Sequence, residues 1–262
     1  MADASITLEN VVVDFPIYSG GGRSLKKTLV AIGTGGRIHR GGGRVSVQAL
    51  KDITFTLDHG DRLALIGHNG AGKTTLLRVM AGVYEPAAGR VRVQGRISTI
   101  FDFTLGLDFD ATGYENIALQ GMLLGLSKHA IAALAEEIAT FTDLGDYLDI
   151  PIRTYSAGML TRLAFAVATA IDPEVLLMDE WIAAGDIGFF DRAEARLQAL
   201  VERAGILVLA SHSVALVRRY CNKALWLEHG TMKAIGPIDD VLRAAGLLSE
   251  EPPAGRLGVA GG

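Results

Sequence analysis

The hydrophobic positions in the first third of the chain fall in short runs separated by polar residues. Residues 5–14 are rich in β-branched side chains, and residues 49–57 and 61–66 repeat this character. Runs of this length and composition favour strands, because branched side chains pack well on a pleated surface. The first third is therefore predicted to be rich in β-structure.

The pattern changes to helical spacing in the middle of the chain and then returns to short runs. Residues 114–147 carry spaced apolar side chains among polar ones, which predicts a mostly helical region. Two apolar strands are predicted at residues 175–178 and 206–209, with a helix around residues 189–203 between them. Strands that alternate with helices predict an α/β fold whose parallel sheet is covered on both faces.

One long stretch, residues 16–48, fits neither pattern. Its glycine clusters are expected to interrupt regular structure, so it is predicted to be a basic, Gly-rich insertion. It contains no Asp or Glu, and apolar residues recur at helical spacing over residues 25–32. The segment is either a solvated loop or a short amphipathic helix at a membrane surface. Its basic residues are Arg23, Lys26, Lys27, Arg37, His39, Arg40 and Arg44.

Composition adds few constraints. The chain has 262 residues, 49% of them hydrophobic, which is ample for a core. A formal charge of −4 gives no global electrostatic reason to bind nucleic acid, and we expect no nucleic-acid partner. The single cysteine, Cys221, is predicted to be structural.

No apolar run approaches the roughly 18 residues of a membrane span, so any membrane connection is expected through a partner. Residues 249–262 are predicted to be a disordered tail.

A phosphate-binding loop is predicted directly after the strand at residues 61–66. Its glycines allow successive backbone N–H groups to point at phosphate oxygens, and the helix that follows adds its positive N-terminal end. Lys73 is expected to bridge the β- and γ-phosphates, and the hydroxyl of Thr74 to ligate Mg²⁺. The alternative is a Gly-rich turn without a ligand. The predicted phosphate-binding residues are Gly67, His68, Asn69, Gly70, Ala71, Gly72, Lys73, Thr74 and Thr75.

Two acidic residues and a histidine follow the later apolar strands. Asp179 and Glu180 close the strand at residues 175–178, where one carboxylate can hold Mg²⁺ through water and its neighbour can polarise the attacking water. Asp179 is the predicted metal residue and Glu180 the predicted general base. His212, after the strand at residues 206–209, is expected to contact the γ-phosphate. A helix cap and a structural histidine are the alternatives.

With these residues in place, the chain resembles the nucleotide-binding domains of ABC transporters. The resemblance becomes specific at Tyr-Ser-Ala-Gly-Met, residues 155–159, which open a helix ahead of Asp179 where the family has its LSGGQ-like signature. Ser156 and the N–H of Gly158 can bind a γ-phosphate at this helix start, although a plain serine N-cap is the alternative. In this family two subunits pair head to tail, so the resemblance implies that these residues serve the ATP of a second copy.

The resemblance covers most of the chain and implies a P-loop NTPase fold of the ABC type over residues 5–246. It implies a parallel-sheet core, an N-terminal antiparallel β part and a helical subdomain inserted at about residues 100–172. ATP and Mg²⁺ are the implied cofactors, and an integral-membrane permease is the implied partner, with the chain at the cytoplasmic side of the membrane. Phe15 is expected to stack on adenine, with Tyr18 as its rival, and Asp186 matches the D-loop aspartate.

Some positions depart from the commonest form of the family. Ala157 and Met159 stand in the signature where Gly and Gln are usual, and Ala183 replaces Ser in the D-loop. The expected Q-loop has no glutamine. Asp102 is the candidate replacement, a side chain that can bind Mg²⁺ or water but cannot donate as an amide does.

These departures are similar to those of one branch of the family. Together with residues 112–117 and 163–170, they resemble the subunits that export O-antigen, capsule and teichoic acid. We therefore expect an ATPase that drives export of a lipid-linked polysaccharide. The alternatives are a drug or lipid cargo, a soluble ABC ATPase of DNA repair or translation, and a nucleotide-gated binding module without turnover.

Overall fold

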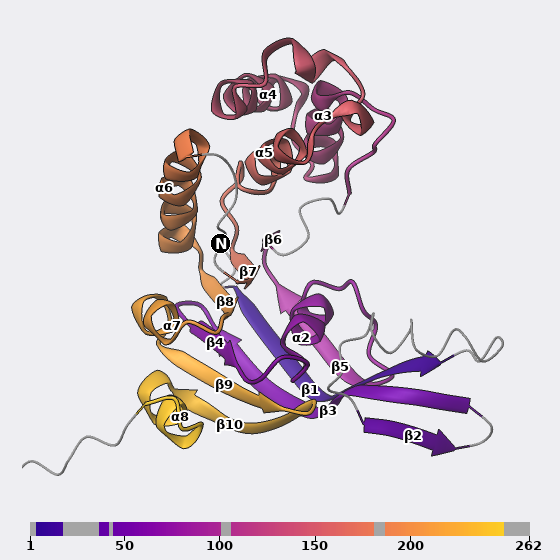
Figure 1. The fold of residues 1–262 in the computed structure, drawn as a ribbon, viewed down its shortest axis with the longest axis vertical. Helices are drawn as coiled ribbons and strands as arrows, with labels where there is room; N and C mark the ends of the chain where they lie inside the picture. Colours follow the sequence, from indigo (N-terminus) through magenta and orange to yellow (C-terminus); the bar gives the residue numbers. More distant parts are fainter. Residues whose placement is uncertain (1–3, 18–36, 42–43, 101–105, 181–186, 249–262) are drawn as a thin grey trace, which may run out of the picture.

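A computed structural model describes residues 4–17, 37–41, 44–100, 106–180 and 187–248. One lobe is built around a twisted sheet, and a second lobe consists of helices α3, α4 and α5, which lie above the strands in Figure 1. None of the helices among these residues has the length and apolar character needed to cross a bilayer.

One half of the ten-stranded sheet is parallel, which confirms the predicted α/β class. Strands β9, β4, β8, β7 and β6 lie side by side in that order and run in one direction. Every residue of β8 is buried, as expected for a parallel strand with helices on both faces. The strands are β4 (Arg62–Ile66), β6 (Ile97–Ile100), β7 (Val175–Asp179), β8 (Ile206–Ala210) and β9 (Lys223–Glu228).

Alternate residues of these strands enter two separate cores. Leu63 and Leu65 of β4 pack on the face that α2 covers, whereas Ala64 and Ile66 pack on the opposite face, with α6, α7 and α8. Cys221 lies in the second core, where burial raises the pKa of its thiol to about 12, in keeping with a structural role. The covering helices are α2 (Lys73–Met80), α6 (Ile187–Arg203), α7 (Val214–Tyr220) and α8 (Ile238–Ala244).

An antiparallel part continues the sheet beyond β9. β10 pairs with β9, meets β3 at a single residue pair, and is followed in the sheet by β3, β1 and β5. β2 pairs with the beginning of β3, so it lies off this path. The bounds are β1 (Ser5–Ile17), β2 (Arg37–Gly41), β3 (Arg44–Asp58), β5 (Ala88–Gln94) and β10 (Thr231–Pro237).

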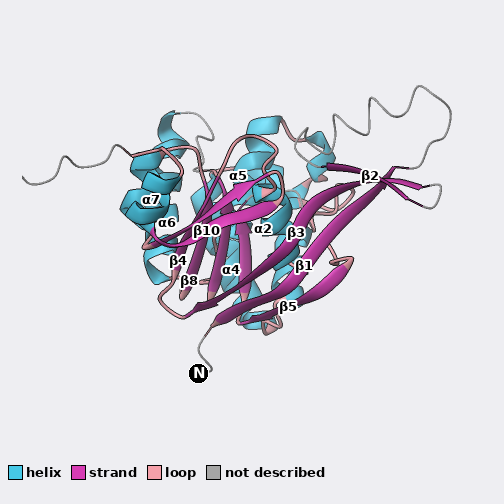
Figure 2. Ribbon diagram, turned by 90° about the horizontal axis from the view of Figure 1, so that it is seen from below, coloured by secondary structure: helices cyan, strands magenta, loops and turns pink. Residues whose placement is uncertain are grey.

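The Gly-rich stretch, residues 16–48, is more regular than predicted where the structure describes it. β1 continues to Ile17 and β3 begins at Arg44, and their ends pair with each other and with β2. Figure 2 shows β2 at the opposite end of these long strands from the N-terminus. The glycine clusters at residues 20–22 and 35–36, and residues 42–43, lie outside the described residues, so the predicted insertion stays a prediction. Outside the described residues lie Tyr18, Asp102, Ala183, Asp186, the expected helix at residues 25–32 and the tail at residues 249–262.

The helical lobe occupies residues within the predicted subdomain and has its own core. Ile117, Ile138 and Leu163, one from each long helix, are fully buried in it. Thr112 starts α3 through a capping box with Glu115, which satisfies two backbone N–H groups at the helix start. The lobe contains α3 (Gly113–Leu123), α4 (Lys128–Thr142), α5 (Ala157–Ala168) and the short helices η1 (Gly145–Asp149) and η2 (Ile152–Thr154).

Aromatic rings join the two lobes. Phe141 of α4, Phe165 of α5 and Phe189 of α6 have ring centroids 5.4 to 6.1 Å apart. The guanidinium of Arg196 on α6 lies 4.5 Å from the Phe141 ring centroid and forms a 2.9 Å ion pair with Glu137 of α4. These contacts fix α5 against α6, and so they set where the start of α5 lies relative to the sheet.

Candidate nucleotide site

A cavity of about 580 Å³ lies between the P-loop and the antiparallel strands. Its size is that of a small-ligand site. Its lining includes acidic side chains, a histidine and two aromatic rings. The cavity is lined by Phe15, Val47, Ala49, Asn69, Gly70, Gly72, Lys73, Thr74, Thr75, Arg78, Tyr84, Asp179, Glu180 and His212.

Two glycines give the P-loop its shape. Gly67 has a φ of +147°, and a Cβ there would lie 2.2 Å from the carbonyl oxygen of Leu227. Gly72 has a φ of +111° and precedes the first residue of α2, and a Cβ there would lie 3.1 Å from the carbonyl oxygen of Ala49. Glycine tolerates these positive φ values, and a Cβ at Gly67 would also clash with backbone, so the loop can curl tightly and bring the N-terminus of α2 to the cavity wall.

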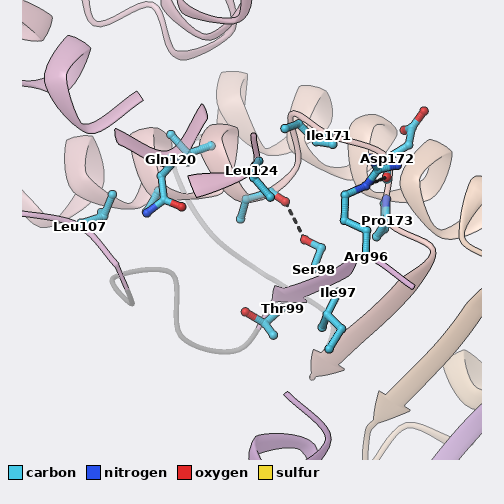
Figure 3. Close-up of a pocket in the computed structure, with 13 residues that line it drawn as sticks. Arg96, Ile97, Ser98, Thr99, Leu107, Gln120, Leu124, Ile171, Asp172 and Pro173 are labelled. Atoms are coloured by element: carbon cyan, nitrogen blue, oxygen red, sulfur yellow. Dashed lines mark hydrogen bonds between the residues drawn. The ribbon is translucent and has the colours of Figure 1, made fainter. Parts of the chain in front are cut away.

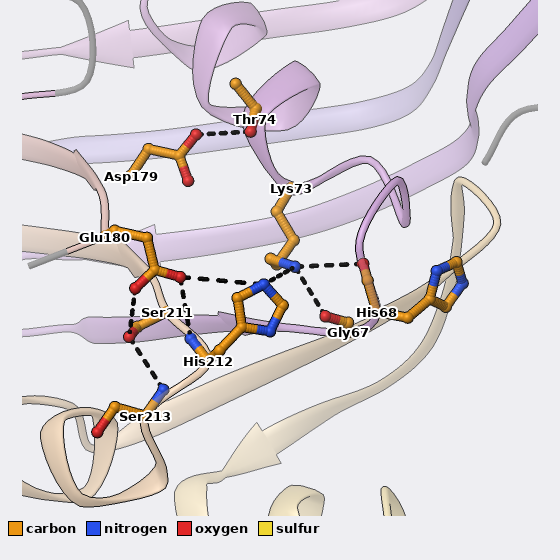
Figure 4. A network of polar contacts seen from close by, with 9 residues as sticks. All are labelled: Gly67, His68, Lys73, Thr74, Asp179, Glu180, Ser211, His212 and Ser213. Carbon is orange, nitrogen blue, oxygen red and sulfur yellow. Dashed lines mark hydrogen bonds and ion pairs between the residues drawn. The ribbon is translucent and has the colours of Figure 1, made fainter. Parts of the chain in front are cut away.

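Lys73 places a buried cation at this wall. Its side chain donates to the carbonyl oxygens of Gly67 at 2.7 Å and His68 at 3.3 Å, and Nζ lies 3.3 Å from Nε2 of His212 (Figure 4). Burial lowers the pKa of Lys73, and the charges of Asp179 and Glu180 oppose that effect. The negative oxygens of a phosphate would favour the ammonium form further.

Thr74 and Asp179 bring two oxygen ligands together from different elements. The Thr74 hydroxyl, in the first turn of α2, donates to the Asp179 carboxylate at the end of β7, at 2.5 Å. Hydroxyl and carboxylate oxygens, completed by phosphate oxygens and water, are the ligands that Mg²⁺ prefers. The residues therefore fit the predicted magnesium site.

Glu180 is held at the next position in a strained backbone conformation. Its φ of +69° is unfavourable for a residue with a side chain, and such outliers cluster at functional sites. The carboxylate accepts hydrogen bonds from the Ser211 hydroxyl at 3.0 Å and from the His212 backbone N–H at 3.1 Å (Figure 4). About half of its side-chain surface stays exposed, so the carboxylate can reach a water molecule in the cavity.

Most predicted residues meet at this cavity, but three parts of the loop do not line it. Ala71 is buried in the sheet core, and the His68 ring lies 4.6 Å from that of His229. Gly67 does not line the cavity, but its carbonyl oxygen accepts a hydrogen bond from the Lys73 side chain. The predicted residues that line the cavity are Phe15, Asn69, Gly70, Gly72, Lys73, Thr74, Thr75, Asp179, Glu180 and His212.

The signature residues are not part of this cavity. Ser156 is the N-cap of α5, where its hydroxyl accepts from the Met159 N–H at 3.3 Å, and both Ser156 and Gly158 are exposed. The start of α5 therefore presents an accessible helix N-terminus outside the chain's own phosphate site.

Five residues at the site were not predicted from the sequence. Val47, Ala49, Arg78 and Tyr84 line the cavity, and the buried Ser211 orients Glu180. For Arg78 a signal was present, because it lies three residues after Thr75 and hence on the same face of α2.

A second cavity, of about 150 Å³, lies where β6 meets the helical lobe (Figure 3). The Ser98 hydroxyl donates to the carbonyl oxygen of Ala168 at 2.9 Å, and the Arg96 side chain donates to that of Asp172 at 3.2 Å. These polar groups are paired with backbone, and the cavity has no P-loop residue in its lining. The larger cavity is therefore the candidate nucleotide site.

Comparisons with known proteins show the family of this chain. The sequence profile of a family described as ABC transporter matches residues 50–183. The O-antigen export system ATP-binding protein RfbE of Yersinia enterocolitica is 45% identical over 86% of this chain and 95% of its own length. The teichoic acids export ATP-binding protein TagH of Listeria monocytogenes is 35% identical over 75% of this chain and 58% of its own. A dimeric post-hydrolysis structure of the ATP-binding cassette MJ0796, bound to ADP and Pi, has a TM-score of 0.62 at 19% identity and covers 89% of this chain and 98% of its own.

Proposed function

Because the chain belongs to the ABC transporter family, we propose that it is the ATP-hydrolysing subunit of an exporter that moves a lipid-linked cell-surface polysaccharide through a separate membrane permease. The observation that carries the ATPase assignment is the meeting of Lys73, Thr74, Asp179, Glu180 and His212 around one cavity. The cargo assignment is supported by relatives named for O-antigen and teichoic acid export. In this proposal the chain binds the permease at the cytoplasmic side of the membrane.

Each residue of the site has a part in hydrolysis. Lys73 and the amides of the P-loop would bind the β- and γ-phosphates. Thr74 and Asp179 would hold Mg²⁺, which, when bound, would neutralise charge on the phosphate oxygens. Glu180, held by Ser211 and the His212 N–H, accepts a proton from the attacking water. The His212 side chain lies beside Lys73, where it can donate to the γ-phosphate.

The exposed signature supports a head-to-tail dimer. Ser156 and Gly158 lie outside the cavity of their own chain, so the phosphate that they contact is that of a second copy. A related fold, the cassette MJ0796, forms a dimer with ADP and Pi bound. Closure of two subunits around two ATP molecules, followed by hydrolysis and reopening, is the motion that we propose drives the permease.

Mixed dimers test this pairing. Ser156→Arg should abolish hydrolysis while ATP affinity of the monomer stays near that of the wild type, because the bulky cation blocks only the partner's site. A Ser156→Arg subunit mixed with a Lys73→Ala subunit forms one composite site that contains both intact motifs. We expect the mixture to regain ATPase activity, measured by phosphate release, although each variant alone is inactive. Failure of every mixing ratio to restore turnover would contradict a functional composite site.

Cells that lack this chain test the cargo. We expect them to lose a surface polysaccharide and to accumulate its lipid-linked form inside, as measured by surface labelling and lipid extraction. The wild-type chain should restore export, and Glu180→Gln should not. Normal surface polymer together with increased sensitivity to a drug would instead support the alternative cargo.

A further inference from the structure

Residues 112–117 belong to the pattern that resembles polysaccharide exporters, yet none of them lines the nucleotide cavity. Asn116, within this stretch, is fully buried although its side chain is polar. Its side-chain oxygen accepts from the Asp108 N–H at 2.7 Å, and its amide nitrogen donates to the carbonyl oxygens of Asp108 and Thr112, each at 2.9 Å. Buried polar groups whose hydrogen bonds are satisfied make the structure around them rigid. Asn116 therefore fixes the conformation of the loop at residues 108–112.

This loop is bonded in turn to the segment that leads into the signature. The Ile152 N–H donates to the carbonyl oxygen of Ala111 at 3.0 Å. The Arg153 N–H donates to the carbonyl oxygen of Phe109, also at 3.0 Å. The Arg153 guanidinium forms an ion pair with Asp110, but both side chains are largely exposed, so this pair adds little. The backbone just before the signature is thus held to the loop that precedes α3.

Tyr155 makes a further contact at the residue before Ser156. Its hydroxyl donates to the carbonyl oxygen of Tyr147 at 2.6 Å, and the side chain packs against the core of the helical lobe. Gly113 leaves room for the hydroxyl, because a Cβ there would lie 2.7 Å from the hydroxyl oxygen. Burial raises the pKa of Tyr155 and the charge of Asp149 adds to this effect, so the hydroxyl stays a donor at neutral pH. The ring is therefore held both by packing and at its polar end.

We propose that Tyr155 is the positioning residue of the signature, and that its hydrogen bond to the Tyr147 carbonyl holds Ser156 in the orientation that meets the ATP of a second copy. The inference rests on the proposed function and adds what holds the signature in place. Tyr155 does not line the nucleotide cavity of its own chain, so its loss should leave the affinity of the monomer for ATP unchanged. It should act only on the site that its own signature completes.

Mixed dimers place the same substitution on either side of one composite site. A Ser156→Arg subunit and a Lys73→Ala subunit share one intact site, which uses the P-loop of the first and the signature of the second. Tyr155→Phe on the Lys73→Ala subunit should lower phosphate release about two- to tenfold, the range for one lost hydrogen bond. On the Ser156→Arg subunit, whose signature is already blocked, it should have no effect. An equal loss on both subunits would overturn the inference, because it would mean general damage to the helical lobe. No loss on either subunit would also overturn it.

Hydrogen exchange measures the positioning without turnover. In the Tyr155→Phe chain, the Met159 and Leu160 N–H groups, which bond to Ser156, should exchange about two- to tenfold faster, because the start of α5 opens more often. Amides of α2 should keep their wild-type rates. Tyr114→Phe, at an exposed tyrosine of the same lobe, is the matched control and should change neither set. Unchanged exchange at α5 would overturn the inference, whereas a parent mixture without activity would count against the proposed composite site.

Discussion

Glu180→Gln is expected to lower kcat for ATP hydrolysis by about 10²–10⁴-fold, the range that a positioned general base contributes. The amide keeps nearly the same shape: its oxygen can still accept from the His212 N–H, and its NH2 group can donate to the Ser211 hydroxyl oxygen, so the local backbone should survive the change. It cannot take a proton from water. ATP binding should remain, because Lys73 and the P-loop are unchanged, and dimers closed around ATP should accumulate.

Phosphate release and size-exclusion chromatography with Mg²⁺ and ATP measure these two effects. Glu194→Gln, the same substitution at an exposed position of α6, is the matched control and should hydrolyse ATP at the wild-type rate. Wild-type turnover by Glu180→Gln would exclude Glu180 as the base. A monomeric elution profile with ATP would contradict the trapped dimer.

The site was largely predictable because its residues belong to local patterns that are linked by one rule of topology. The P-loop follows one buried strand, and Asp179 and His212 follow two others, and parallel strands bring their carboxyl ends to the same edge of the sheet. β7 and β8 pair directly, and β8 pairs with β4, which supplies the loop. The order of the strands in the sequence and their common direction were therefore enough to predict that these side chains lie close together.

The aromatic part of the cavity lining was harder to predict because it depends on contacts between distant segments. Tyr84 meets Phe15 only because the chain after α2 turns back through hydrogen bonds to the carbonyl oxygen of Arg78. Ser211 likewise acts through Glu180, which is 31 positions earlier in the chain. No periodicity marks such residues. The same holds for the ends of β1 and β3, where residues 14–17 pair with residues 45–48.

Lys73→Ala is expected to remove most of the affinity for ATP, which is the second large effect. The ammonium is buried and bonds to loop carbonyl oxygens, so no other side chain can take its place without entering the loop. Hydrogen bonds to charged groups contribute about 1.5–3 kcal/mol each, and each 1.4 kcal/mol is about a tenfold change in affinity. Loss of the contacts to the β- and γ-phosphates should therefore weaken binding by about 10²-fold or more.

Calorimetry with ATP and with inorganic tripolyphosphate, which has no base, separates lost phosphate binding from lost binding of the base. Lys73→Ala should weaken both ligands, because its charge acts on phosphate alone, whereas Phe15→Ala should weaken ATP only. Lys128→Ala, which removes an exposed lysine at the start of α4, should bind both as the wild type does. In this variant the carbonyl oxygens of Gly67 and His68 lose the ammonium that donates to them. Their partial negative charges then repel the phosphate oxygens. Lys73→Ala is thus expected to bind ATP and tripolyphosphate more weakly than the loss of one cation implies. Wild-type affinity of this variant for tripolyphosphate would exclude Lys73 from the phosphate site.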